Sequence, residues 1–253
     1  MKIAVITGAS SGMGRDFVCQ LDASDAYDEI WVIARRRDRL ESLASDVRAP
    51  LRILALDLTK QESIEEYKTA LAECNPTVAV LVNGSGFGRF GAFMDYPMAD
   101  YDTMVDLNVK SLVAVTYATL PYMKKGGEIY QLGSLSAFQP VPYINVYGAT
   151  KAFVLSFSRA LNQELRKTGI RVMAVCPGWV RTEFFDHAVK DDTIKYYNKF
   201  FDSDEVVRRA LKDMKRGKDV SVCGFSIRAQ VLATKLLPHK LIMYIWQKQQ
   251  KKL

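Results

Sequence analysis

The stretch K-I-A-V-I-T-G-A-S-S-G-M-G, residues 2–14, decides the fold of this chain. Its first part, Lys2–Thr7, is a short apolar run rich in β-branched residues, which predicts a buried strand. Glycines follow at Gly8, Gly12 and Gly14, and a helical pattern begins at Gly12. Glycine allows a tight turn and a close approach of the backbone to a pyrophosphate, which then sits at the N-terminus of the helix. The stretch therefore predicts a strand–turn–helix unit that binds a dinucleotide, with an ordinary glycine-rich turn as the alternative.

The rest of the chain repeats this alternation. We expect further strands at Glu29–Ala34, Leu51–Leu56, Val78–Val82, Gly127–Leu132, Ile170–Cys176 and, more weakly, Asp219–Cys223. Helical patterns lie between them, at Gly12–Ser24, Arg37–Val47, Gln61–Glu73, Asp106–Lys124 and Val146–Thr168. This rhythm predicts one α/β domain with a doubly wound, mostly parallel, seven-stranded sheet and helices on both faces. Its ligand loops gather at the carboxyl ends of the strands.

Composition narrows the classes of function. The chain has 253 residues, of which 49% are hydrophobic and 25% charged, as expected for a globular enzyme-sized domain. Four scattered cysteines form no disulfide or metal spacing and indicate a reducing, cytoplasmic setting. With two histidines and no cysteine cluster, we expect no metal site. The net charge of +7 is interpreted as scattered surface charge, and no nucleic-acid motif accompanies it, so we expect no nucleic-acid partner.

Tyr147 and Lys151 stand in the pattern Y-G-A-T-K, with Ser134 thirteen residues upstream. On a helix, positions i and i+4 lie on one face, so the phenol and the ammonium can share a site. A cation beside a Tyr stabilises the phenolate and lowers its pKa from ~10, which makes the Tyr a usable general acid or base. A solvated pair of helix neighbours is the alternative when this pattern stands alone.

With its other motifs the chain resembles the short-chain dehydrogenase/reductase family, over nearly all of residues 1–224. The further motifs, in family order, are D-L-T with Asp57 and Leu58, N-G-S-G at Asn83–Gly86, L-N-V-K with Asn108, L-G-S-L-S with Ser134, and P-G-W-V-R-T at Pro177–Thr182. Ser136 is the alternative to Ser134. Gly84 departs from the family, which has a second Asn there whose amide helps to hold the central strand.

The resemblance implies a Rossmann fold and a catalytic tetrad of Asn108, Ser134, Tyr147 and Lys151. Ser134 and Tyr147 would bind and protonate a carbonyl oxygen. Lys151 would lower the pKa of Tyr147 and hold the nicotinamide ribose, and Asn108 would hold a water that connects Lys151 to solvent. The expected cofactor-binding residues are Gly8, Ser10, Ser11, Gly12, Met13, Gly14, Arg15, Arg35, Arg36, Asp57, Leu58, Asn83, Gly84, Tyr147, Lys151, Pro177, Gly178, Val180 and Thr182.

The residues after the second strand predict the form of the cofactor. An NAD enzyme carries an acid about 20 residues past the glycines, at the end of that strand. This chain instead reads A-R-R-R at 34–37. An Arg can pair with a 2′-phosphate through its planar fork of donors, whereas an acid would repel it. NADP(H) is therefore expected, with Arg35 and Arg15 as the first candidates for the phosphate and Arg36 next.

Aromatic and apolar residues cluster where the substrate should enter. We expect contacts from Ser134, Leu135, Phe138, Tyr143, Phe184 and Phe185, within a substrate region that includes about 183–215. Such a lining favours a bulky hydrophobic ketone or alcohol, a steroid or bile acid above all, as in hydroxysteroid dehydrogenases and carbonyl reductases. Arg89, Arg181 and Lys190 are candidates to bind a carboxylate.

Residues 225–253 form an extension beyond the catalytic domain of residues 1–224. Its pattern is helical, with an apolar block at Leu241–Trp246 and basic residues behind it. It could pack over the pocket or at a subunit interface, contact a membrane surface through 241–253, or fray in solvent. The apolar block is too short to span a bilayer.

The leading hypothesis is an NADP(H)-dependent oxidoreductase that interconverts a hydrophobic ketone and a secondary alcohol. A 3-oxoacyl-carrier-protein reductase is the alternative within the enzymes, because it shares every motif. A non-catalytic NADP(H)-binding sensor or scaffold is the alternative outside them. The resemblance also implies a homodimer or homotetramer.

Overall fold

A parallel sheet forms the centre of the protein. The computed structural model describes residues 1–24, 26–188 and 194–252, and within them seven strands pair in the order β3-β2-β1-β4-β5-β6-β9. Every pair in this sheet is parallel, as expected. The strands are β1 (Lys2–Thr7), β2 (Glu29–Ile33), β3 (Leu51–Leu54), β4 (Thr77–Asn83), β5 (Met123–Leu132), β6 (Arg171–Val175) and β9 (Val220–Ser221). The strand order reverses between β1 and β4, so the ligand-binding crevice of such a sheet lies there.

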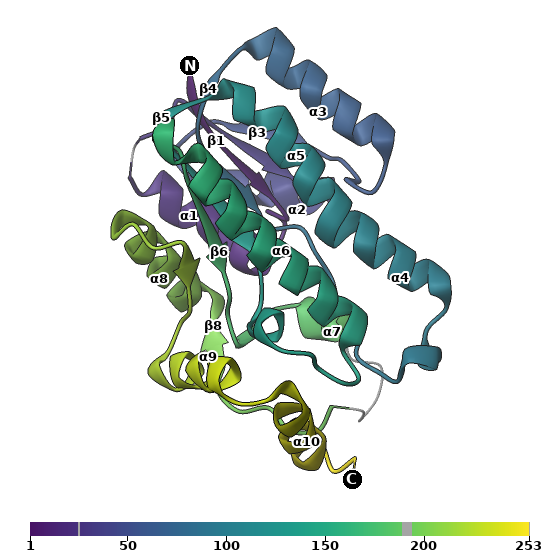
Figure 1. Ribbon diagram of the computed structural model, residues 1–253. Coiled ribbons are helices and arrows are strands. Elements are labelled where there is room, and N and C mark those ends of the chain that lie inside the picture. The colour runs from purple at the N-terminus through teal and green to yellow at the C-terminus, as the bar shows by residue number, and fades with distance from the viewer. Residues whose placement is uncertain (25, 189–193, 253) are drawn as a thin grey trace.

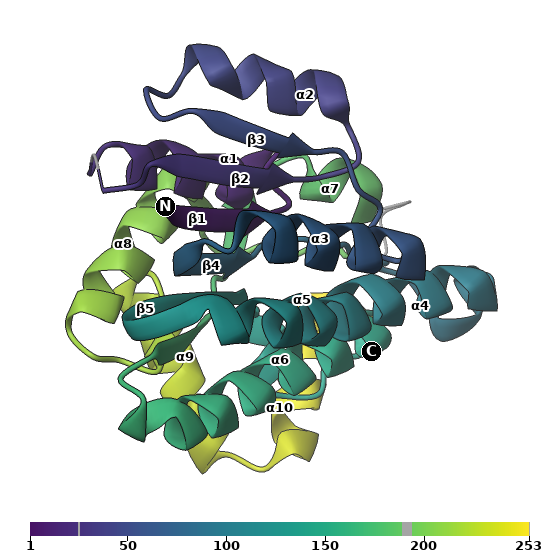
Figure 2. The ribbon, with the colours of Figure 1, turned by 90° about the horizontal axis from the view of Figure 1, so that it is seen from above.

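Helices cover both faces of the sheet (Figures 1 and 2). One face packs on α1 (Gly12–Asp22), α2 (Arg37–Glu41) and α8 (Ser203–Lys215), and the other on α3 (Gln61–Cys74), α5 (Ser111–Thr119) and α6 (Asn145–Glu164). This doubly wound α/β arrangement confirms the predicted fold class.

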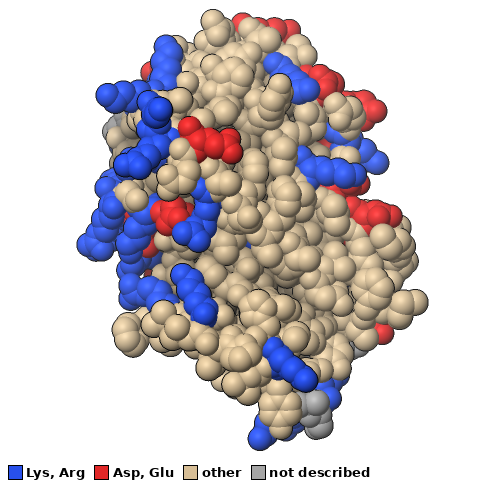
Figure 3. Space-filling view, in the orientation of Figure 1, with Lys and Arg blue, Asp and Glu red and all other residues tan. Residues whose placement is uncertain are grey.

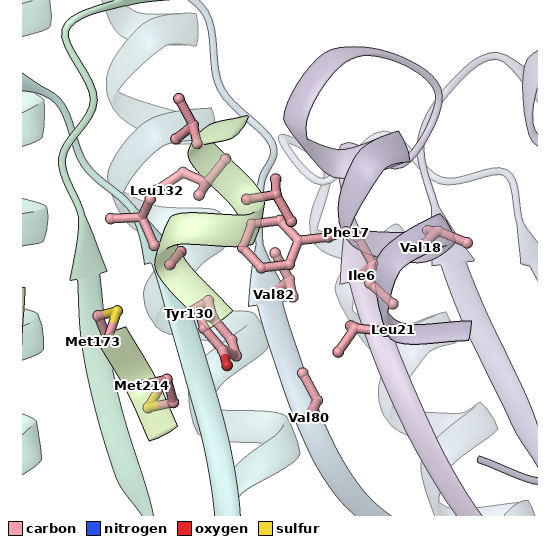
Figure 4. Packing of buried hydrophobic residues seen from close by; sticks show 14 of the residues in the cluster. Ile6, Phe17, Val18, Leu21, Val80, Val82, Tyr130, Leu132, Met173 and Met214 are labelled. Carbon is pink, nitrogen blue, oxygen red and sulfur yellow. The ribbon is translucent and has the colours of Figure 1, made fainter. Parts of the chain in front are cut away.

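The first core cluster fixes the helix that follows the glycine turn. Phe17 of α1 is fully buried and points between Val82 and Tyr130 (Figure 4). The rings of Phe17 and Tyr130 are 5.2 Å apart between centroids. Complete burial of a Phe side chain contributes roughly 1.5–3 kcal/mol. The N-terminus of α1 is thus held rigidly at the carboxyl end of β1.

The predicted helix Asp106–Lys124 is wrong at both ends. Helix α4 (Met98–Val105) already precedes it, a π-helical turn occupies Asp106–Lys110, and α5 follows. Pro121 lies in a short 3₁₀ turn after α5, and β5 begins at Met123. Proline lacks the N–H that would continue a helix, which is why the helix stops there.

Several shorter elements were not predicted. Strands β7 (Trp179–Arg181) and β8 (Phe200–Asp202) pair in parallel as a small second sheet, and α7 (Phe184–Ala188) follows β7. The extension was predicted to be helical, and it forms two helices, α9 (Phe225–Leu236) and α10 (His239–Gln249), at one end of the molecule (Figure 1). We call them the C-terminal helix pair.

Candidate active site

The glycine loop after β1 is shaped as a cradle. Gly8 has a φ of +68°, and its N–H donates to the carbonyl oxygen of Ile33 at 2.8 Å. A Cβ on Gly14 would lie 2.1 Å from the carbonyl oxygen of Gly8, so only glycine lets α1 begin this close to the turn. A backbone approach of this kind at a helix N-terminus fits a pyrophosphate. The residues present therefore fit a dinucleotide.

Arg36 is the arginine that reaches this loop. Its Nη2 donates to Oγ of Ser10 and Oγ of Ser11, both at 3.2 Å, and its Nη1 donates to Oε2 of Glu183 at 2.9 Å. The two residues that we ranked ahead of it lie differently. Arg15 pairs with Asp46, and Arg35 is exposed at the end of β2.

The loop after β4 explains the departure at Gly84. A Cβ there would lie 2.5 Å from the carbonyl oxygen of Thr7, and the Gly84 N–H donates to Oγ1 of Thr7 at 3.0 Å. A side chain at this position would separate β1 from β4. Asn83 is buried beside it and donates to Oγ1 of Thr116 at 3.0 Å, so one amide still holds this strand end.

Two of the residues expected to bind the cofactor, Asp57 and Leu58, have local partners. The carboxylate of Asp57 accepts from the backbone N–H and the hydroxyl of Thr59, at 3.1 Å and 2.8 Å. The side chain of Leu58 is buried in the core, on the side of α3.

Helix α6 brings Tyr147 and Lys151 to one face, opposite Ser134. The hydroxyl of Ser134 lies close enough to the Tyr147 hydroxyl to act on its pKa, which it lowers. The ammonium of Lys151 lies 5.6 Å from the centroid of the Tyr147 ring and donates to the carbonyl oxygen of Leu132 at 2.7 Å. Lys151 is 6% exposed, so its charge is almost fully removed from water. The hydroxyl of Ser136, the alternative to Ser134, is buried without a hydrogen-bond partner among the described residues.

Asn108, the fourth residue of the tetrad, lies in the π-helical turn between α4 and α5. Its Oδ1 accepts from the N–H of Phe87 at 3.0 Å. Its Nδ2 donates to the carbonyl oxygen of Phe87 at 2.9 Å and to Oγ1 of Thr150 at 3.1 Å. The side chain thus ties the loop after β4 to α6 and sets the distance between them. Its role toward a water stays a prediction.

Burial controls the protonation of this site. It raises the pKa of Tyr147 to about 12, although the hydrogen bond with Ser134 acts in the opposite direction. It lowers the pKa of Lys151 to about 8. In this geometry burial outweighs the lowering of the Tyr147 pKa that we expected from Lys151, whose ammonium is directed at the carbonyl oxygen of Leu132. Near neutral pH, Tyr147 carries its proton and Lys151 its charge.

A cavity of about 500 Å³ opens above these residues. Its floor is Ser134, Tyr147 and Lys151, and its walls extend from Met13 and Gly84 to the C-terminal helix pair. Leu135, Phe184 and Phe185 line it as predicted, and so do Pro177, Gly178, Val180 and Thr182.

Phe138 and Tyr143 were predicted to touch the substrate, but neither lines the cavity. Phe138 packs against the core cluster under α8 and α9. Tyr143 has a φ of +69°, and its ring lies 5.3 Å from the ammonium of Lys252.

The sequence of the chain has recognisable relatives. The pattern of the family described as "short chain dehydrogenase" matches residues 2–193. The chain belongs to this family. Sulfoacetaldehyde reductase 2 of Chromohalobacter salexigens is 37% identical over 188 residues, which cover 72% of this chain and 74% of the relative.

Solved structures agree with this membership. A short-chain dehydrogenase from Sphingobium yanoikuyae in complex with NADPH has a TM-score of 0.81 and 29% identity, and the match covers 96% of this chain and 95% of that chain. The bulky-bulky ketone specific alcohol dehydrogenase from Comamonas testosteroni has a TM-score of 0.75 and 28% identity, with 93% and 92% covered. The protein is thus an oxidoreductase of the short-chain dehydrogenase family that acts on alcohol or ketone groups.

The C-terminal helix pair closes the cavity of this short-chain dehydrogenase. Trp246 donates from Nε1 to the carbonyl oxygen of Pro142 at 3.0 Å and stacks on Trp179 at 6.5 Å between centroids. Gln250 is fully buried, and its Oε1 accepts from the N–H groups of Lys195 and Tyr196 at 2.8 Å and 2.9 Å. These contacts favour the interpretation that the extension packs over the pocket, and they exclude a frayed tail.

Some lining residues were missed by sequence reasoning. They are chiefly Trp179, Asn198 and Gln230. Trp179 lies inside the P-G-W-V-R-T motif, which we expected to bind the cofactor. Its position in the sequence could therefore have placed it near the cavity. The segment 203–215 of the predicted substrate region forms α8, which packs on α1 and contributes no described residue to the lining.

The described lining of the cavity carries almost no charge. Among the described lining residues Lys151 is the one charged side chain. The cations considered for a carboxylate lie elsewhere: Arg89 pairs with Asp100 and Arg181 with Asp202, each at 2.8 Å. Lys190, the third candidate, lies outside the described residues.

Proposed function

We propose that this protein reduces a bulky, uncharged ketone to a secondary alcohol with NADP(H), and catalyses the reverse reaction. The observation that carries the proposal is the cavity lining. A large, mostly apolar space ends on Ser134 and Tyr147, and its described walls hold no carboxylate, guanidinium or imidazole. An isolated charge on a substrate would be desolvated there without a partner, which costs several kcal/mol or more.

The cofactor is NADP(H). Arg36 reaches the loop between β1 and α1 and offers a fork of donors, which suits a 2′-phosphate. The acid that would bind the ribose of NAD is replaced by Ala34 and the arginines after it. The NADPH complex of the Sphingobium relative supports the same choice. The glycine cradle would hold the pyrophosphate, and the segment Pro177–Thr182 would hold the nicotinamide end.

The tetrad divides the reaction among its side chains. When bound, the nicotinamide supplies or accepts the hydride. Tyr147 holds the proton that the carbonyl oxygen needs and stays protonated because burial raises its pKa. Ser134 donates a hydrogen bond to the same oxygen as its negative charge builds. Lys151, buried and protonated, supplies a positive field beside the phenol that favours release of the proton.

The substrates named for relatives differ from this proposal. A sulfonate, as in sulfoacetaldehyde, would need a cation in the cavity besides Lys151. The bulky ketones of the Comamonas relative need none. Within the steroid class, the same reasoning favours a neutral steroid ketone over a bile acid, whose carboxylate would have no partner among the described lining residues.

The quaternary structure is also a proposal. Helices α5 and α6 expose Tyr117 and Phe153 on their outer faces. Large exposed apolar residues on neighbouring helices suit an interface between copies. We infer a homodimer or homotetramer through these helices, which light scattering of the purified protein tests.

A substrate panel tests the proposed activity. Neutral steroid ketones, bile acids, sulfoacetaldehyde and a 3-oxoacyl substrate are compared at the NADPH absorbance band, with NADH as the second cofactor. We expect turnover of the neutral steroid ketones with NADPH. Activity confined to the 3-oxoacyl substrate would assign the protein to the carrier-protein reductases. Cofactor binding without turnover of any member would favour a sensor or scaffold.

A further inference from the structure

We propose that the C-terminal helix pair docks on an anionic membrane surface and holds the mouth of the cavity against the lipid. No helix of the described residues is long and apolar enough to cross a bilayer. The contact would therefore be peripheral, with the helices lying in the plane of the interface. The docking does not depend on the proposed function. The further idea that substrate enters the cavity from the lipid rests on the proposed function.

The outer side of the pair is apolar. Leu232 and Leu236 of α9 are 58% and 74% exposed, and Leu241 and Tyr244 of α10 are 43% and 53% exposed. In each helix the two residues are three or four positions apart, so they lie on one face. The opposite side of α10 carries Ile242 and Trp246, which line the cavity. The pair is thus apolar on both sides, and only one side is covered.

The same segment carries most of the net charge of the protein. Residues 225–253 contain six Lys or Arg and no Asp or Glu, while the whole chain has a net charge of +7. The rest of the chain is thus nearly neutral, which corrects the interpretation of the charge as scattered. Figure 3 shows basic side chains at this end of the molecule, among uncharged residues.

Charge complementarity selects an anionic partner. The basic residues of the pair are Arg228, Lys235, Lys240 and Lys248, with Lys251 and Lys252 behind them. Anionic lipid attracts such clusters while the interfacial region accepts leucine and tyrosine side chains. A second copy placed on this face by a two-fold axis would bring like charges together. A nucleic acid is the less suitable anionic partner, because its phosphate backbone binds basic side chains and offers nothing to the exposed leucines.

The cavity opens within this surface. Leu237 and Ile245 line the cavity, and they are also 40% and 41% exposed. The mouth of the cavity is therefore bordered by the residues that would rest on lipid. A bulky neutral ketone partitions into a bilayer, so a docked enzyme would meet it at high local concentration.

Vesicle sedimentation tests the docking. The full chain is mixed with vesicles of phosphatidylcholine alone or of phosphatidylcholine with phosphatidylglycerol. We expect binding to the anionic vesicles, weakened by added salt because screening acts on exposed charges. Leu236→Ser with Leu241→Ser should reduce the bound fraction at least tenfold. Lys240→Gln with Lys248→Gln should reduce it similarly at low salt.

Two control variants keep the test specific. Met98→Ser removes an exposed apolar residue of α4, and Lys212→Gln with Lys215→Gln removes two exposed charges of α8. Both should bind vesicles like the unmodified chain. Sedimentation needs no turnover, so its result is independent of the proposed activity.

Several results would overturn the docking. One is absence of binding to either vesicle at low salt. Another is an equal loss in the α8 control. A third is that the unmodified chain does not bind vesicles while the leucine variant changes its oligomeric state, which would assign the face to a second copy.

Discussion

At the scale of single residues, Tyr147 owes its chemistry to burial. Tyr147 is 9% exposed, lies beside Ser134 and stays protonated, since burial raises its pKa to about 12. Tyr147→Phe should lower kcat by about 10²–10⁴-fold, which is the usual contribution of a positioned acid. The ring still packs on Phe90 and Phe184, whose centroids lie 5.7 Å and 5.5 Å away, so folding should persist. NADPH titration by fluorescence should show unchanged binding, and turnover near that of the unmodified enzyme would refute the assignment.

Lys151 makes the reaction sensitive to alkaline pH. Its folded-state pKa is lowered from 10.5 to about 8, so the ammonium is present below this value and is lost as pH rises through it. We expect the reduction rate to be level near neutral pH and to fall above about 8, while Tyr147 stays protonated. Lys151→Arg keeps a cation at every pH and should lack the fall, even at a lower rate. A profile that is identical in both enzymes would contradict this role.

The same shift affects stability in the opposite direction. The unfolded chain holds this proton up to about 10.5, whereas the folded chain releases it near 8. Because the unfolded state binds more protons in this window, the free energy of unfolding should rise with pH there. Urea unfolding across the window, with Lys151→Met as the control that lacks this proton, measures the effect.

Arg36 and Glu183 should set cofactor affinity in opposite senses. Removing the fork in Arg36→Ala should weaken NADPH about 10–100-fold, the effect of losing a charge-assisted hydrogen bond, and leave NADH nearly unchanged. Glu183→Gln removes a carboxylate 2.9 Å from the same guanidinium. It should tighten NADPH a few-fold, because exposed ion pairs contribute roughly 0–1 kcal/mol. Equilibrium titration with both cofactors measures this, and equal losses for NADH and NADPH in Arg36→Ala would refute the assignment.

At this scale the sequence predicted that Tyr147, Lys151 and Ser134 meet, but not which arginine reaches the glycine loop. Tyr147, Lys151 and Ser134 follow from spacing that a helix and a neighbouring strand end impose. Arg35 and Arg36 are adjacent, and which of them faces the loop depends on where β2 ends. The pKa of Tyr147 depends on how α6, which carries it, packs beside α7. No local sequence pattern predicts that packing.

At the scale of elements, the C-terminal helix pair is held through Gln250. Its buried amide takes part in three hydrogen bonds with the backbone of Lys195 and Tyr196. Gln250→Ala would remove these three hydrogen bonds, each of which contributes about 0.5–1.5 kcal/mol, and would loosen the end of α10. We expect KM for a bulky ketone to rise about tenfold while a small ketone is reduced as before. Gln247→Ala, a neighbour outside the cavity lining, is the control, and an unchanged KM in both variants would contradict the anchoring role.

The prediction of the central strands is confirmed because strands such as β4 and β6 are runs rich in β-branched residues and are mostly buried. The prediction of one helix at Asp106–Lys124 was wrong because the π-helical turn around Asn108 keeps a helical hydrophobic pattern but changes the register of that pattern. Strand β8 escaped prediction because it gains its order by pairing with β7, about twenty residues earlier in the chain.

At the scale of the whole molecule, the cavity joins segments that are far apart in the sequence. Its floor comes from β5 and α6, one wall from the segment after β6, and its cover from α9 and α10. The family motifs predict the floor, because every relative needs it. The cover has no such motif, and the absence of charged lining residues becomes visible only when these walls are assembled.

One measurement tests the central claim most directly. Two ketones of the same bulky skeleton, one neutral and one bearing a carboxylate, are compared by kcat/KM with NADPH. We expect the neutral ketone to be favoured at least ~100-fold, since an unpaired charge in the cavity costs several kcal/mol. Equal rates, or a preference for the carboxylate, would contradict the assignment of a bulky, uncharged substrate.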